Sequence, residues 1–169
     1  MAIDRTSKFA FAQLVDKANR VTASAFLTTL IEAVPYKIHT VLTHNGIQFR
    51  LPPRYADGPT ARLSSHMVGM RCQENGIEHR CTKINHPWTN GQVERMNRTI
   101  KEATVKRYHY DDHGQLRRHL ADFPNAYNFR ATTKDPQRPH AIRIHLSMLD
   151  VQPERFIINP LQQMPGLNT

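Results

Sequence analysis

Apolar residues recur along the chain at two alternating periods, and each change of period predicts a change between strand and helix. Residues 8–15 and 37–42 are short apolar runs with partial alternation, which is typical of strands. Between them, apolar residues from Ala23 to Val34 fall three or four positions apart, which predicts a helix that Pro35 ends. This order of elements favours an α/β fold.

The pattern continues toward the C-terminus with further helices and strands. The end of the 37–42 strand leads into His44-Asn45-Gly46, and α/β proteins place ligands at such strand ends. A Pro-rich loop follows at 50–62. The other predicted elements are a strand stump at 1–4, a helix from about Ser64 to Glu74 stopped by Asn75-Gly76, a strand at 77–84 and an amphipathic helix at 112–130.

A helix that begins just before Glu94 is predicted to have one buried face and one charged stripe. The buried face comprises Val93, Met96, Ile100 and Ala103, which recur at steps of three and four. The neighbouring stripe comprises Glu94, Arg98, Lys101 and Val105. Asn90 or Thr89 is expected to cap the helix, and Gly91 allows a ligand to approach the backbone closely.

This stripe has two interpretations. A carboxylate beside cations can place a bound metal ion next to a DNA phosphate, because the ion needs oxygen ligands and the phosphate needs positive charge. The alternative is an ordinary solvated helix face, which is the more common case for charged side chains. The spacing of the residues alone does not decide between the two.

The overall charge favours a nucleic-acid partner. The chain of 169 residues has 23 Lys and Arg against 14 Asp and Glu, a net charge of +9. A chain this basic commonly meets nucleic acid, although a merely basic surface is the alternative. The sequence contains no apolar run long enough to span a membrane and no signal-peptide pattern. Cys72 and Cys81 form no paired ligand motif, which suggests a reducing, cytoplasmic compartment.

Three ordered blocks of the sequence resemble the integrase-type DDE transposases, most closely the IS481-like insertion-sequence group. The blocks are the segment from His86 to Lys101, the segment from Ile38 to Phe49 and the segment from Ala2 to Phe9. The resemblance implies an α/β, RNase H-like integrase catalytic core with a mixed sheet flanked by helices. It also implies a partial catalytic core at 1–130 with a divergent C-terminal tail at 131–169. The chain would then be an N-terminally truncated, C-terminal fragment.

The resemblance also implies a function and its residues. The family carries out DNA integration and transposition with Mg²⁺ or Mn²⁺ held by two Asp and one Glu. Glu94 takes the position of the third acid and of a metal ligand, whereas His44 replaces the second Asp. The expected partners are DNA, both transposon ends and target, and a second copy or an intact transposase at the bacterial nucleoid. The expected DNA-binding residues are Asn90, Gly91, Arg95, Asn97, Arg98 and Lys101.

The departures from the family pattern predict that this chain is catalytically inactive. The first Asp would lie upstream of the first residue, and imidazole is a poor ligand for magnesium. Asp4 is expected to act in a turn rather than to bind metal, and Asp57 is not expected to replace the missing carboxylate. The sequence leaves three alternatives open: a DNA-binding module that interferes with an intact enzyme, a nuclease rebuilt around His44 and Glu94 with another ion, and a product without function.

Residues 131–150 interrupt the resemblance, and the clearest departure is at 138–145. One permissible choice of codons for this stretch, read one base later, encodes Gly-Leu-Thr-Pro-Tyr-Glu-Phe, which is close to what the family has there. A local frameshift is therefore one explanation of the divergent tail. The stretch also lacks a clear apolar period, so no packing role is expected for 138–148.

Overall fold

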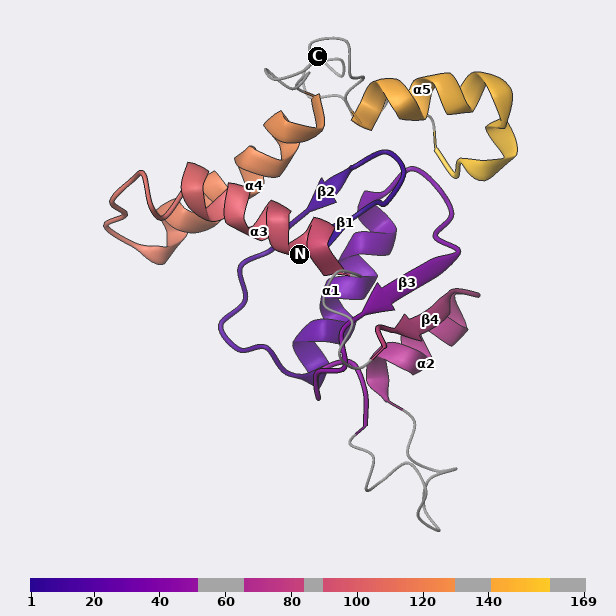
Figure 1. Ribbon diagram of the computed structural model, residues 1–169, viewed down its shortest axis with the longest axis horizontal. Helices are drawn as coiled ribbons and strands as arrows, with labels where there is room; N and C mark the ends of the chain where they lie inside the picture. Colours follow the sequence, from indigo (N-terminus) through magenta and orange to yellow (C-terminus); the bar gives the residue numbers. More distant parts are fainter. Residues whose placement is uncertain (52–65, 84–89, 130–140, 159–169) are drawn as a thin grey trace. The chain divides into compact units, whose positions relative to one another are not determined.

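The computed structural model describes residues 1–51, 66–83, 90–129 and 141–158, which are drawn in colour in Figure 1. These residues form two compact units. The first unit contains residues 1–14, 35–37 and the described residues from 91 onward. Its elements are β1 (Ala2–Ile3), β2 (Ala10–Phe11), α3 (Gly91–Ala103), α4 (His113–Phe129), α5 (Ala141–Val151) and the 3₁₀ helix η3 (Pro153–Arg155). The second unit contains α1 (Arg20–Ala33), β3 (Thr40–Thr43), α2 (Met67–Glu74) and β4 (Glu78–Cys81).

The second unit is built around the parallel pair β3 and β4. Thr40 lies opposite Glu78 and Thr43 opposite Cys81, and α2 lies on the connection between the two strands. Parallel strands need such a crossover, because the chain must return from the end of one strand to the start of the next, which a tight turn cannot do. Helix α1 packs on α2, and it starts at a capping box in which Asn19 and Thr22 exchange side-chain bonds with each other's backbone. The buried side chains of this unit include Leu27, Leu30, Val34, Val68, Cys72 and Ile77.

The first unit begins with a hairpin whose turn is organised by Asp4. Strands β1 and β2 are antiparallel, with Ala2 opposite Phe11 and Ile3 opposite Ala10. The Asp4 carboxylate accepts hydrogen bonds from the backbone N–H groups of Thr6 and Ser7 at 2.6 and 2.8 Å. The turn role expected for Asp4 is thereby confirmed.

The strand expected at 8–15 is much shorter in the structure, where β2 covers only Ala10–Phe11. Lys8 belongs to the turn instead, because its N–H donates to the carbonyl of Asp4 at 3.1 Å and its φ of 66° lies in the left-handed region. The left-handed conformation is incompatible with a strand. The prediction of a strand was correct in place and wrong in length.

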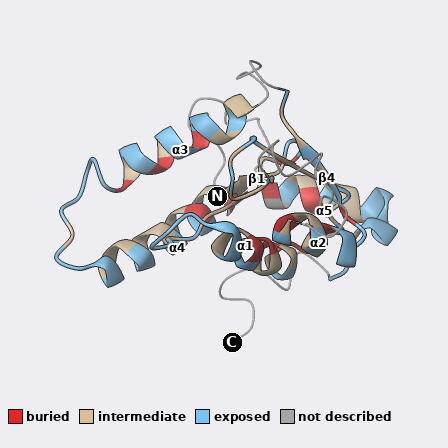
Figure 2. Cartoon of the chain, turned by 90° about the horizontal axis from the view of Figure 1, so that it is seen from below, coloured by how far each residue is buried: buried red, intermediate tan, exposed pale blue. Residues whose placement is uncertain are grey.

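Helices α3 and α4 cover the hairpin and form the core of the first unit. Ala10, Met96 and Ile100 are buried together, and Met1, Ile3, Leu120, Phe123 and Tyr127 pack against them. The apolar face expected for the helix after Gly91 is therefore the face that packs. Figure 2 shows this as buried positions along one side of α3 with exposed positions on the other.

A buried asparagine joins α4 to the free edge of β2. Asn128 accepts a hydrogen bond from the N–H of Ala10 at 2.8 Å and donates one to the carbonyl of Ala10 at 2.9 Å. Asn128 is 2% exposed and Ala10 is 1% exposed, so water does not compete for these groups. One side chain thus satisfies both backbone groups of a strand residue that has β1 on its other side.

Helix α5 corrects, for residues 141–148, the expectation that 138–148 have no packing role, and 138–140 lie outside the described residues. Ala141 and His145 are buried, and the His145 ring lies 4.9 Å from the Tyr36 ring and 5.7 Å from the Phe9 ring. After α5 the chain returns to Tyr36, which forms an antiparallel bridge with Phe156. The apolar period was missed because the residue that fills the aromatic cluster is a histidine.

His145 is a buried polar side chain. Among the described residues, neither ring nitrogen has a hydrogen-bond partner. Burial lowers the pKa of the imidazole, and the nearby Asp4 carboxylate opposes this shift. Burial and the same carboxylate raise the pKa of Tyr36, so the phenol stays protonated. For His145, the lowered pKa means that burial favours the neutral form of the imidazole.

The first prediction concerns Asn128. Replacement by alanine leaves the N–H and the carbonyl of Ala10 buried and unpaired, so we expect a loss of about 2–4 kcal/mol in the free energy of unfolding. Asn125→Ala is the matched control, because Asn125 is an exposed position of the same helix and should cost less than about 0.5 kcal/mol. Urea unfolding measures both variants. Equal stability of the two variants would contradict the role of the amide.

The second prediction is a pH dependence caused by His145. Its folded-state pKa lies below the unfolded value, so the unfolded chain binds the proton first as the pH falls. Stability is therefore complete above about pH 6.5 and decreases toward the folded-state pKa, by no more than about 1.4 kcal/mol per pH unit.

His145→Leu serves as the comparison, because it removes this titration and the unpaired nitrogens while leaving the other nine histidines in place. The free energy of unfolding of both proteins is measured at pH 8 and pH 5. The free energy of unfolding of the unmodified chain should fall further below that of His145→Leu at pH 5 than at pH 8. A deficit that is the same at both pH values would show that His145 is not responsible.

Candidate nucleic-acid interface

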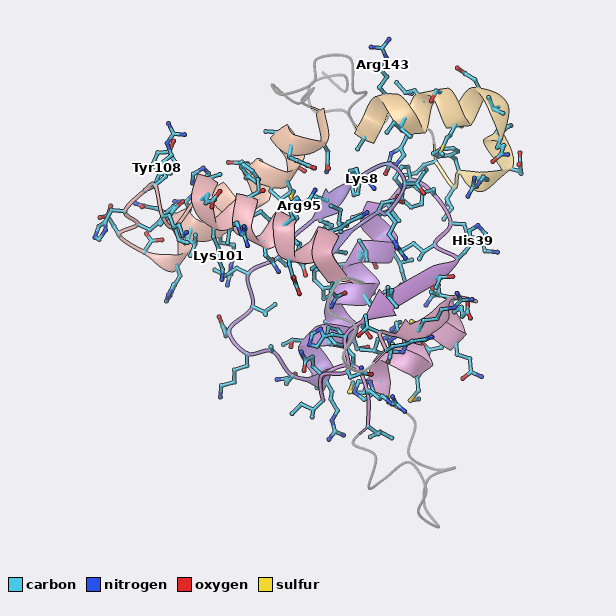
Figure 3. The ribbon with its side chains drawn as sticks, viewed as in Figure 1. Lys8, His39, Arg95, Lys101, Tyr108 and Arg143 are labelled. Carbon is cyan, nitrogen blue, oxygen red and sulfur yellow. The ribbon has the colours of Figure 1, made fainter. Side chains whose placement is uncertain are left out.

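The outer face of α3 carries the residues expected to contact DNA. Arg95, Asn97, Arg98 and Lys101 are all exposed, as is Glu94 in the first turn of the helix. Met96 and Ile100 anchor the opposite face, so helical geometry leaves the polar positions outside. Figure 3 shows Arg95 and Lys101 along the ribbon of α3. The predicted division of this helix into a buried face and a charged face is confirmed.

The cations of α3 are available to a partner. Within the described part of the chain, the ion pairs join Arg71 to Glu74 and Arg80 to Glu78, both in the second unit. Within these described residues, no ion pair involves Arg95, Arg98 or Lys101. Their charges are therefore not neutralised by neighbouring carboxylates in the described residues, which is the condition that phosphate binding requires.

The start of α3 is only partly described. Asn90 lies directly before the helix and is half-buried, whereas Thr89 and the rest of 84–89 lie outside the described residues. A Cβ added to Gly91 would meet no described atom within 4 Å. The packing of the protein itself therefore does not require glycine at this position, and the expected close approach of a ligand remains a prediction.

His44, the position of the second acid in the resemblance, lies in the second unit in a tight turn after β3. The amide nitrogen of Gln48 lies 3.1 Å from His44 Nε2 and donates to it, which requires that Nε2 carries no proton. The Phe49 ring packs on the imidazole at 5.0 Å in an edge-on arrangement. The lone pair of Nε2 is thus occupied by an internal hydrogen bond.

Neighbouring residues fix this turn. The side chain of Asn45 donates to the carbonyl of Thr82 at 2.7 Å, which ties the turn to the end of β4. A Cβ on Gly46 would lie 2.6 Å from His44 Nε2 and 2.5 Å from the Gln48 oxygen. Only glycine fits here while the pair stays in place. The turn therefore holds His44 in a defined position.

Polar groups near this turn were not singled out by sequence reasoning. Thr43 Oγ1 lies 2.9 Å from His79 Nε2, and the N–H of Val68 donates to His66 Nδ1 at the start of α2. Burial lowers the pKa of His79, and the electrostatic effect of His66 lowers it further. Histidine is not a usual helix-capping residue, so the role of His66 had no sequence signal.

The described residues do not fit a magnesium site. No group of three or more His, Cys, Asp or Glu lies close enough together in residues 1–51, 66–83, 90–129 and 141–158 to hold a metal ion. At the His44 turn the available groups are an imidazole and an amide, whereas magnesium takes carboxylate oxygens and water. Asp57 lies outside the described residues.

Comparisons with known proteins agree with this geometry. Residues 75–141 match the family model of the integrase core domain, a span that contains α3 and Glu94. A Caenorhabditis elegans protein, uncharacterized protein K02A2.6, is 27% identical over 106 residues, which are 63% of this chain and 7% of that protein. The crystal structure of the catalytic core domain of BIV integrase aligns with a TM-score of 0.61 at 17% identity, covering 89% of this chain and 87% of that chain.

The structural likeness defines the class of fold, which is the RNase H-like integrase catalytic core, and it confirms the expected α/β class. Together with the family match, it confirms the resemblance drawn from the sequence blocks. The chain is therefore similar to the integrase core domain over residues 75–141, and it shares its fold with the catalytic core of an integrase. None of the helices in the described residues is both long enough and apolar enough to cross a membrane.

Proposed function

We propose that this chain is a DNA-binding relative of the integrase-type transposases that does not itself cleave or join DNA. Two observations together carry the proposal. The face of α3 that is exposed is basic, and His44 stands where the family has a carboxylate. The basic face supplies the sequence-independent part of DNA affinity. The histidine removes an oxygen ligand and a negative charge that the two-metal reaction needs.

Under this proposal the residues divide into two groups. Asn90, Gly91, Arg95, Asn97, Arg98 and Lys101 contact DNA, with the cations on phosphates. Glu94 is the remaining position of the acid set, and it needs further carboxylates to hold Mg²⁺ or Mn²⁺. Transposon ends and target DNA are the proposed ligands. A second copy or an intact transposase on the bacterial nucleoid is the proposed protein partner.

A chain of this kind would act by occupying DNA. It would compete with an active transposase for the same ends without reacting, which makes it an interfering module. The rival proposal, a nuclease rebuilt around His44 with a different metal ion, is less well supported. Gln48 already uses the Nε2 lone pair of His44, so metal binding through that atom must first break a hydrogen bond.

The third prediction tests DNA binding by α3. Arg98→Gln should weaken binding to a short duplex and reduce the slope of log affinity against log salt by about 0.9, the value for one lost phosphate contact. Arg71→Gln removes the same charge from a half-buried arginine that is already paired with Glu74 at 3.0 Å, and it serves as the control. Fluorescence anisotropy at several salt concentrations measures both. The proposal fails if both variants lose the same affinity.

The fourth prediction tests catalysis. With Mg²⁺ or Mn²⁺ the unmodified chain should neither cut nor join short duplex DNA, because the second carboxylate is replaced. Cleavage by the unmodified chain that Glu94→Gln abolishes would overturn the proposed inactivity.

Metal affinity provides a second readout for the same prediction. His44→Asp should bind Mn²⁺ more tightly than the unmodified chain in calorimetry, because it returns a carboxylate to the turn. His39→Asp adds the same charge at an exposed position just before β3 and should not increase the affinity as much. Equal gains from the two variants would show that position 44 has no special relation to a metal site.

A further inference from the structure

The connection between α3 and α4 presents an exposed aromatic ring on a fixed support. The Tyr108 side chain is 49% exposed. The ring of His119, from α4, lies 5.0 Å from the Tyr108 ring at 70°, and the Tyr110 hydroxyl lies 2.6 Å from His119 Nδ1. This hydrogen bond between the hydroxyl and the ring nitrogen orients the imidazole against Tyr108. The result is a rigid aromatic surface facing solvent.

The backbone of this connection is ordered by its own hydrogen bonds. The N–H groups of Arg107 and Tyr108 both donate to the carbonyl of Thr104, at 2.9 and 3.0 Å. Thr104 is 1% exposed, and its hydroxyl donates to the carbonyl of Ile100 at 2.6 Å. The segment is therefore anchored to the buried face of α3. Little conformational entropy remains to be lost when Tyr108 meets a ligand.

One cation lies beside the ring, and others are close to it in the sequence. The guanidinium of Arg107 lies 5.8 Å from the centroid of Tyr108. Between 104 and 119 the exposed cationic side chains are Lys106, Arg107, Arg117 and Arg118, against two aspartates. Both aspartates already accept hydrogen bonds from Gln115 of α4, Asp112 from its N–H at 2.7 Å and Asp111 from its side chain at 3.1 Å.

We propose that this surface, Tyr108 with Arg107 and the neighbouring cations, binds an unpaired stretch of DNA by stacking one base on the tyrosine ring. A base must leave its duplex to expose both faces, and an aromatic ring among cations is the combination that single strands recognise. Figure 3 shows Tyr108 beyond the end of α3 that carries Lys101, away from Arg95. The surface therefore extends the proposed DNA-binding face of α3, and it depends on that proposed function.

The fifth prediction separates stacking from charge. Tyr108→Leu removes the ring, whereas Tyr108→Phe keeps it, and both change an exposed side chain. Binding to a labelled single strand of about 15 thymidines should weaken roughly 5-fold to 100-fold in Tyr108→Leu, the range found when a stacking ring is removed. Tyr108→Phe should bind this strand within about 2-fold of the unmodified chain, because stacking uses only the ring face.

A blunt duplex of the same length separates this proposal from general DNA binding. Tyr108→Leu should bind this duplex with the same affinity as the unmodified chain, because paired bases offer no free face for stacking. Arg107→Gln should weaken binding to both DNAs and reduce the slope of log affinity against log salt by about 0.9, because the proposed contact of Arg107 is to a phosphate. Circular dichroism of each variant checks that the helices are retained.

Each outcome of this experiment is decisive. Loss confined to the single strand in Tyr108→Leu, with recovery in Tyr108→Phe, supports the stacking surface. Binding of the duplex but not of the single strand, or equal affinity of Tyr108→Leu and the unmodified chain for the single strand, overturns it and leaves the proposed function standing. Failure of the unmodified chain to bind either DNA overturns the proposed function and this inference together.

Discussion

The two hydrogen bonds between the Asn128 amide and the backbone of Ala10 are the constraint on which the first unit depends. Strand β2 has only two residues, so it has few ladder bonds to stabilise it. The amide satisfies both polar groups of Ala10 in a buried position and joins residues that lie 118 positions apart. With Ala10 held, Met96 and Ile100 have a surface to pack on. The same packing fixes which face of α3 meets solvent.

The charged face of α3 is a consequence of that packing. A helix that buries one narrow apolar stripe must present its other positions to water. In α3 those positions are rich in arginine and lysine, and they lie next to the aromatic and cationic groups that follow Thr104. Because Thr104 is itself buried, the anchoring of the helix extends into the connection. The exposed basic positions of α3 therefore follow from the packing of a single helix.

Two histidines show how one residue type takes different roles in different surroundings. His44 lies in an exposed turn and shares a hydrogen bond with Gln48, so the position has become part of the local structure of the turn. His145 lies among aromatic rings, and burial lowers its pKa. At position 44 the imidazole nitrogen is used in a local hydrogen bond within the turn. At position 145 the imidazole affects the stability of the fold, because burial disfavours its charged form.

The sequence by itself determined the elements whose period is strong and local. The α/β order, the buried and charged faces of α3, the turn role of Asp4 and the likeness to the integrase core follow from residue spacing and motif order. Only the tertiary structure decided the short length of β2, the packing of α5 and the clamp of Asn128, since each depends on a residue distant in sequence. The histidine in α5 hid its buried role, and the support beneath Tyr108 comes from another helix. Local patterns determine which face a helix buries, whereas burial of polar groups is decided by partners that only folding brings close.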